Sequence, residues 1–287
     1  MSSEPPENQN NALRGRVEAY AKWAFEAKFP EHFKKFQRTL TGNLEAAIGE
    51  IVIFDFLRQS RLKPELSDTP GTGGADFICN PEGREQFVVE VTAFGEDTVE
   101  RQTGIPKEGF EGFSGYRMMT PALRTRISSK ADQLSGYQFA RVLAITTTHQ
   151  LTFGAFAREG ADALLTSDLQ FQFPLNEPDP EFASVTNLQN SVFFRPDDKG
   201  QIVPCRQSIS AVLLVTINVY DGISCVVGIL HPEPLHRFSI ENLPEVPFLR
   251  VSEWPIKGNE IKCHWEIVTP RPIMFPHSWL PKPTEGA

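Results

Sequence analysis

The chain has 287 residues, 40% hydrophobic and 22% charged, which is enough apolar material for one large domain or two small ones to fold without disulfides. Its formal net charge of −8 argues against a general nucleic-acid coating protein, because nonspecific binding depends on many Lys and Arg contacts with phosphates. Any contact with nucleic acid would have to be local.

No stretch offers the roughly 20 consecutive apolar residues that cross a bilayer, and segment 1–11 is polar. We therefore expect a cytoplasmic protein without a membrane contact. The four cysteines lack any C-x-x-C spacing, which argues against a zinc knuckle or a redox motif. We expect their thiols to be reduced and largely buried.

Segment 11–59 predicts two or three helices. Apolar side chains recur at helical spacing, and Pro30 interrupts the pattern before a second segment begins. After Gly42 the run 43–60 is apolar on most faces and ends in basic residues, which is typical of a helix pressed into the core. Acids on such a helix are of interest because an unpaired buried carboxylate is costly.

Segments 75–79 and 86–94 predict two strands of a β-hairpin, since both are rich in β-branched or aromatic residues and a turn-forming segment, 80–85, joins them. Segment 95–116 holds many Gly and charged residues with no periodicity. It predicts a long loop that lies beside a site or covers it.

The following segments predict helices and strands in alternation. A helix over 119–137, with Pro121 near its first turn, precedes a short strand at 141–148 of the kind buried in a sheet. A further helix is expected around 153–165.

Near the end of the chain, strands at 210–220 and 223–230 flank Asp221-Gly222 and predict a second hairpin. Segment 261–268 is the last strand candidate, and a Pro-rich extension follows it. We expect a single domain over 1–287, with an α/β fold in which a mixed central sheet is flanked by helices on both faces.

Two carboxylates of the first hairpin, Asp76 and Glu90, have apolar neighbours on their strands. Burying such a pair costs several kcal/mol unless a cation or protons compensate it. Oxygen ligands on adjacent strands suit Mg²⁺ or Mn²⁺, with the Val91 carbonyl as a third ligand. Strand alternation places Glu90 and Thr92 on one face. The alternative is that one acid points to solvent from an amphipathic strand.

An acid in an early helix, GGADF on one strand and FVVEVT on the next resemble the E…D…E-x-K arrangement of the PD-(D/E)XK, or restriction-endonuclease-like, superfamily, over about 42–147. The resemblance implies a restriction-endonuclease-like core and metal-dependent hydrolysis of phosphodiester bonds. Asp76 and Glu90 would then be Mg²⁺ ligands, with the backbone oxygen of Val91. The implied partner is nucleic acid, DNA in particular, and a homodimer is left open.

The chain departs from that pattern at Thr92, which stands where the family has its lysine. Some members of the superfamily draw this lysine from a following helix, and here that helix offers Lys130, with Gln133 three residues later on the same face. The alternative for Lys130 is an ordinary solvated lysine. Arg117 and Arg124 suggest a local phosphate-binding stripe on the same helix.

Three acids of the early helix are candidates for the remaining carboxylate. At about 100° per residue, Glu45 and Glu50 lie roughly 140° apart, so only one of them can face the hairpin. We favour Glu50, which is embedded among apolar residues, whereas Glu45 is explained as a favourable charge near the helix start. Asp55 is the third option.

These residues predict a nuclease in which Glu50, Asp76, Glu90 and Lys130 carry the reaction, with Thr92, Gln133 and Glu45 in accessory positions. The main alternative is a non-catalytic binding or scaffold protein of the same fold, which the absence of the E-x-K lysine favours. A hydrolase of another phosphate ester is a third class.

Overall fold

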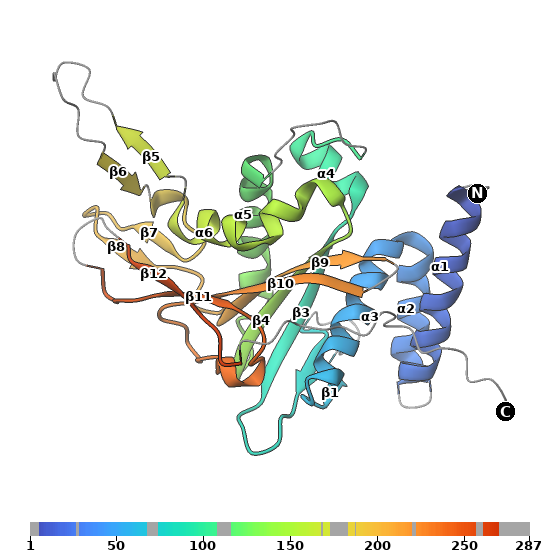
Figure 1. Cartoon of the computed structure of the whole chain (residues 1–287). Helices are drawn as coiled ribbons and strands as arrows, with labels where there is room; N and C mark the ends of the chain where they lie inside the picture. The colour runs from blue at the N-terminus through green and yellow to red at the C-terminus, as the bar shows by residue number, and fades with distance from the viewer. Residues whose placement is uncertain are drawn as a thin grey trace.

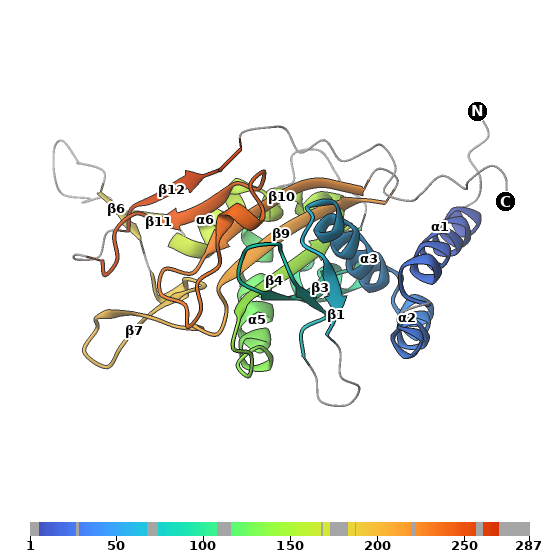
Figure 2. The same cartoon turned by 90° about the horizontal axis from the view of Figure 1, so that it is seen from below.

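An eight-stranded mixed sheet passes through the part of the molecule that the structure describes, with helices on both faces (Figures 1 and 2). The computed structural model describes residues 6–26, 29–67, 74–107, 116–167, 169–172, 183–186, 188–219, 222–256 and 261–269. The α-helices are α1 (Pro6–Ala21), α2 (Pro30–Gly42), α3 (Leu44–Gln59), α4 (Glu96–Thr103), α5 (Tyr116–Gln133) and α6 (Arg158–Thr166). One π-helical turn and three 3₁₀ segments add η1 (Lys22–Glu26), η2 (Gln150–Phe156), η3 (Leu188–Asn190) and η4 (Ile240–Asn242).

The main sheet is built from strands that are distributed along the whole described chain. They are β1 (Pro64–Leu66), β2 (Phe77–Cys79), β3 (Phe87–Phe94), β4 (Ala140–Thr147), β9 (Ala211–Asn218), β10 (Gly222–Leu230), β11 (Phe248–Val251) and β12 (Cys263–Glu266). Two separate antiparallel pairs are β5 (Leu169–Gln172) with β6 (Ala183–Thr186), and β7 (Phe194–Pro196) with β8 (Ile202–Pro204).

The strands follow the order β1-β2-β3-β4-β9-β10-β11-β12. β1, β2 and β3 form an antiparallel meander, β3, β4 and β9 run parallel, and β10 returns antiparallel to β9. β11 is parallel to β10, and β12 is antiparallel to β11. The expected α/β fold with a mixed central sheet flanked by helices is confirmed.

The two faces of the sheet carry different helices. Alternate residues of β3 point to opposite faces, so Phe87 and Val89 pack with α1, α2 and α3, whereas Val88 and Phe94 pack with α4, α5 and α6. All eight residues of β4 are buried, as expected for a parallel strand covered on both sides. Figure 1 shows α1–α3 in blue beside the sheet, and Figure 2 shows α5 on the side away from them.

Of the three helices α1, α2 and α3 on one face, α3 lies closest to the sheet. Asn43 caps it by accepting a hydrogen bond from the Ala46 amide at 3.0 Å, and ten of its 16 residues are buried. Gly49 allows the close approach, because a Cβ there would lie 2.5 Å from the Thr146 Oγ1 of β4. The position next to Gly49 is Glu50, so the packing of this glycine sets where that carboxylate lies.

The expectation of a loop over 95–116 is wrong in its first half, because α4 occupies Glu96–Thr103. Its caps explain it: Glu96 and Asp97 place acids in the first turn, and Gly104 closes the helix at φ +73. Segment 108–115 lies outside the described residues.

Other boundaries differ from the sequence prediction. Pro121 lies inside α5, which begins at Tyr116, and the helix expected at 153–165 is divided into η2 and α6. The prediction did not include the short strands β1, β5, β6, β7, β8 and β11. The hairpins β2–β3 and β9–β10 and the strands β4 and β12 are confirmed, whereas Asp221 and segment 270–287 lie outside the described residues.

Candidate functional site

The β2–β3 hairpin brings Asp76 and Glu90 to the same side of the sheet. Phe77 pairs with Val89, so Asp76, one residue before β2, lies across from Glu90 as the ladder ends. The Asp76 Oδ2 accepts a hydrogen bond from the Val91 amide at 2.7 Å. This bond anchors the Asp76 carboxylate against β3. The structure thus relates Val91 to the site through its N–H.

Glu90 is almost completely buried, with 4% of its side chain exposed, and it is paired with Lys130 of α5. The Lys130 Nζ lies 2.5 Å from the Glu90 Oε1 and 2.8 Å from the Gln133 Oε1. Gln133 in turn donates to the Gly74 carbonyl at 2.9 Å and to Glu90 at 3.2 Å. Two residues of α5 therefore tie the helix to the Glu90 carboxylate and to the chain that leads into β2.

Thr92 is buried on the face of β3 that also carries Glu90, as the alternation predicted. A hydroxyl supplies no positive charge. The cation beside Glu90 is Lys130, from a different element.

The Glu50 side chain belongs to the same cluster, although it comes from α3 on the other face of the sheet. Its Oε1 lies 2.6 Å from the His32 Nε2, and 15% of its side chain is exposed. Its charge acts on Asp76, as described below. The structure places the other two acids of this helix elsewhere.

Glu45 accepts a hydrogen bond from the Glu96 amide at 2.8 Å and one from the Thr148 Oγ1 at 3.0 Å, so it caps the N-terminus of α4. Asp55 faces α1 and accepts a hydrogen bond from the Tyr20 hydroxyl at 2.6 Å, besides bonds from Arg58 and Gln59. Both acids have structural partners that account for them. Their partners do not include the hairpin residues.

The pKa of Asp76 is affected by its burial and by the neighbouring carboxylates. Burial, and then the charges of Glu90 and Glu50, raise the pKa of the Asp76 carboxyl well above its ordinary value. The Val91 N–H and the Lys130 ammonium act in the opposite direction and do not cancel the rise. Three carboxylates from three elements thus lie within electrostatic reach of one another, and one lysine stands beside them.

The side chains around Asp76 offer oxygen donors for a divalent cation, but not in a ready cage. Among the described residues, no three His, Cys, Asp or Glu side chains lie close enough together to form a ready metal cage. Each carboxylate is instead engaged: Asp76 by a backbone amide, Glu90 by Lys130 and Glu50 by His32. The donors are nevertheless hard oxygens, which suit Mg²⁺ or Mn²⁺, and a bound cation would offset the burial of Asp76 and its repulsion by Glu90 and Glu50.

Two residues at the site were not identified from the sequence. His32 shares a face of α2 with the buried Phe36, four residues on, and this spacing was a readable signal of burial but not of its partner. The Tyr137 hydroxyl accepts a hydrogen bond from the Ala75 amide at 2.7 Å, and a Cβ at Gly74 would lie 2.5 Å from it. The glycine before Ala75 was the available sign of this close approach.

The expected stripe of Arg117 and Arg124 stays a prediction, and Arg124 does not share the face of α5 that carries Lys130. Arg124 lies six residues before Lys130, which at about 100° per residue turns it roughly 120° away from the lysine. The Arg117 side chain lies outside the described residues. The arginine four residues before Lys130 is Arg126, and it shares the lysine's face.

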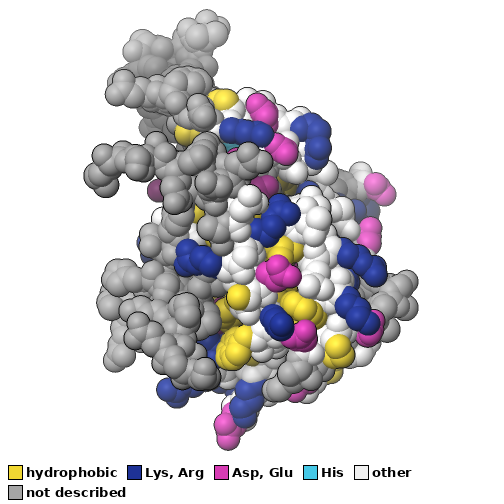
Figure 3. Space-filling model, turned by 90° about the vertical axis from the view of Figure 1, so that its right-hand side faces the viewer, with side chains coloured by type: hydrophobic (Ala, Val, Ile, Leu, Met, Phe, Trp, Pro, Cys, Tyr) yellow, Lys and Arg dark blue, Asp and Glu magenta, His cyan; other side chains and the backbone are white. Residues whose placement is uncertain are grey.

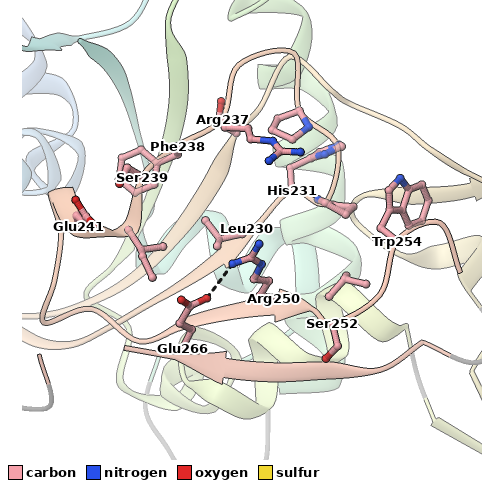
Figure 4. A pocket seen from close by; sticks show the side chains of 15 residues that line it. Leu230, His231, Arg237, Phe238, Ser239, Glu241, Arg250, Ser252, Trp254 and Glu266 are labelled. Carbon is pink, nitrogen blue, oxygen red and sulfur yellow. Dashed lines mark hydrogen bonds and ion pairs between the residues drawn. The ribbon is translucent and has the colours of Figure 1, made fainter. Parts of the chain in front are cut away.

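A separate hollow of about 460 Å³ lies at the ends of β10 and β11 (Figure 4). It is distant from the Asp76 cluster in the sheet, because β4 and β9 lie between β3 and β10. Arg250 in it is paired with Glu266 at 3.1 Å. His231 uses both ring nitrogens, towards the Cys205 carbonyl and the Glu233 amide, and burial lowers its pKa to about 4. The hollow therefore holds an ion pair and a neutral histidine, unlike the cluster around Asp76.

On the face of the molecule that Figure 3 shows, the described basic and acidic side chains are interspersed. Among the described helices, none combines the length and the apolar character needed to span a bilayer.

Comparison of the chain with protein-family models, curated proteins and solved structures finds no match.

Proposed function

We propose that this chain is a metal-dependent nuclease that hydrolyses phosphodiester bonds, with its centre at Glu50, Asp76, Glu90 and Lys130. The observation that carries the proposal is the bond between Lys130 and Glu90. The position two residues after Glu90 is Thr92, yet a lysine from α5 reaches the same carboxylate at 2.5 Å. An ordinary solvated lysine would not be held by both Glu90 and Gln133.

The topology supports the same proposal. The order α3-β1-β2-β3-α4-α5-β4, with β1–β3 antiparallel and β3 parallel to β4, is compatible with the restriction-endonuclease-like core that the motifs resemble. In this arrangement the acids come from α3, from the residue that precedes β2, and from β3. Fold alone does not establish an activity, so the charged cluster carries the argument.

Asp76 and Glu90, with the Val91 carbonyl, would hold Mg²⁺ or Mn²⁺, and the bound ion would supply a nucleophilic hydroxide and neutralise the phosphate. Lys130 would stabilise the charge that develops on the phosphate as the water attacks. Gln133 fixes the Lys130 ammonium in place through its amide oxygen. Glu50, oriented by His32, supplies the third carboxylate of the cluster.

Cleavage of labelled DNA and RNA, single- and double-stranded, with Mg²⁺ or Mn²⁺, tests the proposal. Asp76→Asn, Glu90→Gln and Lys130→Met should each lower the rate by at least about 100-fold, since each removes a group that acts on the transition state. Glu82→Gln is the matched control, because Glu82 is 89% exposed and lies in the hairpin turn.

Unchanged cleavage in the three site variants would place the activity elsewhere. If the wild type binds metal and nucleic acid but cleaves nothing, the chain is the non-catalytic binding protein that Thr92 first suggested.

A further inference from the structure

Helix α5 presents a second cation beside the proposed centre. Arg126 and Lys130 are four residues apart, so they lie within about 40° of each other around the helix and about 6 Å apart along it. Lys130 reaches Glu90 on β3, and Arg126 lies over Phe94 on the same strand. Both contacts join α5 to β3.

The guanidinium of Arg126 has an unusual environment for an arginine. Its central carbon is 5.1 Å from the centre of the Phe94 ring, and the side chain is partly buried. None of the ion pairs between described residues includes Arg126. Burial lowers its pKa, and no carboxylate of the described residues opposes this shift. A partly desolvated guanidinium without an anionic partner favours the binding of an anion.

The position of Arg126 on α5 indicates which kind of anion it would bind. Glu90 and Phe94 are four residues apart on β3, a distance of about 13 Å along a strand, so Arg126 stands beside the proposed centre, next to a later part of β3 than Lys130 does. A nucleic-acid strand carries further phosphates on either side of the bond that is cut. A compact phosphate ester has none.

We propose that Arg126 binds a phosphate next to the scissile one, so that the site takes a polynucleotide strand and not a small phosphate ester. The inference rests on the proposed function and deepens it by assigning a residue of α5 to the substrate strand beside the bond that is cut. It also fits a chain with a net charge of −8, in which contacts with phosphates have to be few and local.

The kinetic test compares Arg126→Gln with wild type on two substrates: a short DNA oligonucleotide and a chromogenic diester that contains a single phosphate. For the oligonucleotide, KM should rise on the order of tenfold with little change in kcat, because a charge-assisted hydrogen bond to a flanking phosphate is lost. For the chromogenic diester, KM should stay unchanged. Arg126→Lys should retain part of the affinity for the oligonucleotide.

Arg158→Gln is the matched control. Arg158 lies over the Trp265 ring at 5.0 Å, so this variant also removes one positive charge and one cation–π contact, but on α6. It should leave both KM values unchanged. Equal effects of Arg126→Gln on both substrates, or equal effects of the two variants, would overturn the inference.

A binding measurement separates this inference from the proposed function. In the presence of a chelator, fluorescence anisotropy of the labelled oligonucleotide should show weaker binding by Arg126→Gln, and the slope of log K against log salt should become shallower by about 1. This holds even for a chain that cleaves nothing. Unchanged affinity and slope would overturn the role of Arg126, whether or not the wild type is a nuclease.

Discussion

The Lys130 ammonium neutralises Glu90 in the structure, and in the proposed function it would also contact the phosphate. The pairing of Glu90 with Lys130 was readable from the sequence only as a hypothesis, from the helical spacing of Lys130 and Gln133 and from the strand position of Glu90. The partner of Glu50 was not readable, since nothing in the sequence around His32 points to an acid 18 residues away. Pairings between distant elements depend on packing, which local periodicity does not encode.

Replacing Lys130 with Met should raise the affinity for Mn²⁺ while it abolishes cleavage. The ammonium lies 2.5 Å from a carboxylate that we propose as a metal ligand, so its positive charge opposes the cation. We expect an increase on the order of tenfold, measured by calorimetry. Lys63→Met serves as the control, since Lys63 is 62% exposed and paired with Glu82 in solvent. Weaker metal binding by Lys130→Met would show that Glu90 is not a ligand.

At the scale of the elements, long segments were predicted well and short ones were not. β3, β4, β9 and β10 have eight or nine residues each, so their apolar content stands out in the sequence. β1 has three residues and begins at Pro64, so it shows no period at all. α4 was missed although its caps were present, because seven of its eight residues are charged or polar and Val99 alone gives no apolar stripe.

Gly49 is the contact on which the distance between α3 and the sheet depends. Gly49→Ala would place a Cβ 2.5 Å from the Thr146 Oγ1, which is buried, so α3 or Thr146 has to move. We expect the free energy of unfolding to fall by about 1–3 kcal/mol, as in overpacked cores. Because Glu50 is the next residue, cleavage should fall as well. Both can be measured by denaturant titration and by rate.

Gly15→Ala is the control for the backbone effect of this substitution. Gly15 lies in α1, and a Cβ there would meet nothing within 4 Å. This variant should gain about 0.5–1 kcal/mol, since alanine restricts the unfolded chain more than glycine does. If Gly49→Ala were stabilised to the same degree, the close approach of α3 to β4 would not constrain Glu50.

At the scale of the whole molecule, the site lies where the two helical layers meet the hairpin. Glu50 comes from the α1–α3 layer, Lys130 from the α4–α6 layer, and Asp76 and Glu90 from the sheet between them. The chain therefore has to fold completely before these charges come together. The repulsion among the carboxylates is a cost that the folded state bears and the unfolded chain does not.

This repulsion predicts a pH dependence of stability. The pKa of Asp76 is higher in the folded chain than in the unfolded one, so the folded state holds its proton to a higher pH. The stability contributed by this group is full below the ordinary range of an Asp carboxyl and is lost as the pH rises through the raised pKa. In a chelator, the Tm of the wild type should therefore decline over that interval, and Asp76→Asn should decline less.

A divalent cation should reverse the decline, because it stabilises the ionised carboxylates and binds the folded chain alone. At a concentration 100 times the dissociation constant the gain is about 2.7 kcal/mol, which differential scanning calorimetry resolves. The gain should be larger at pH 8 than at pH 5, and Asp76→Asn should lose most of it. Asp198→Asn, an exposed turn residue, should behave as the wild type. An equal gain in wild type and Asp76→Asn would mean that the cation binds elsewhere, and the charged cluster would then be balanced by Lys130 alone.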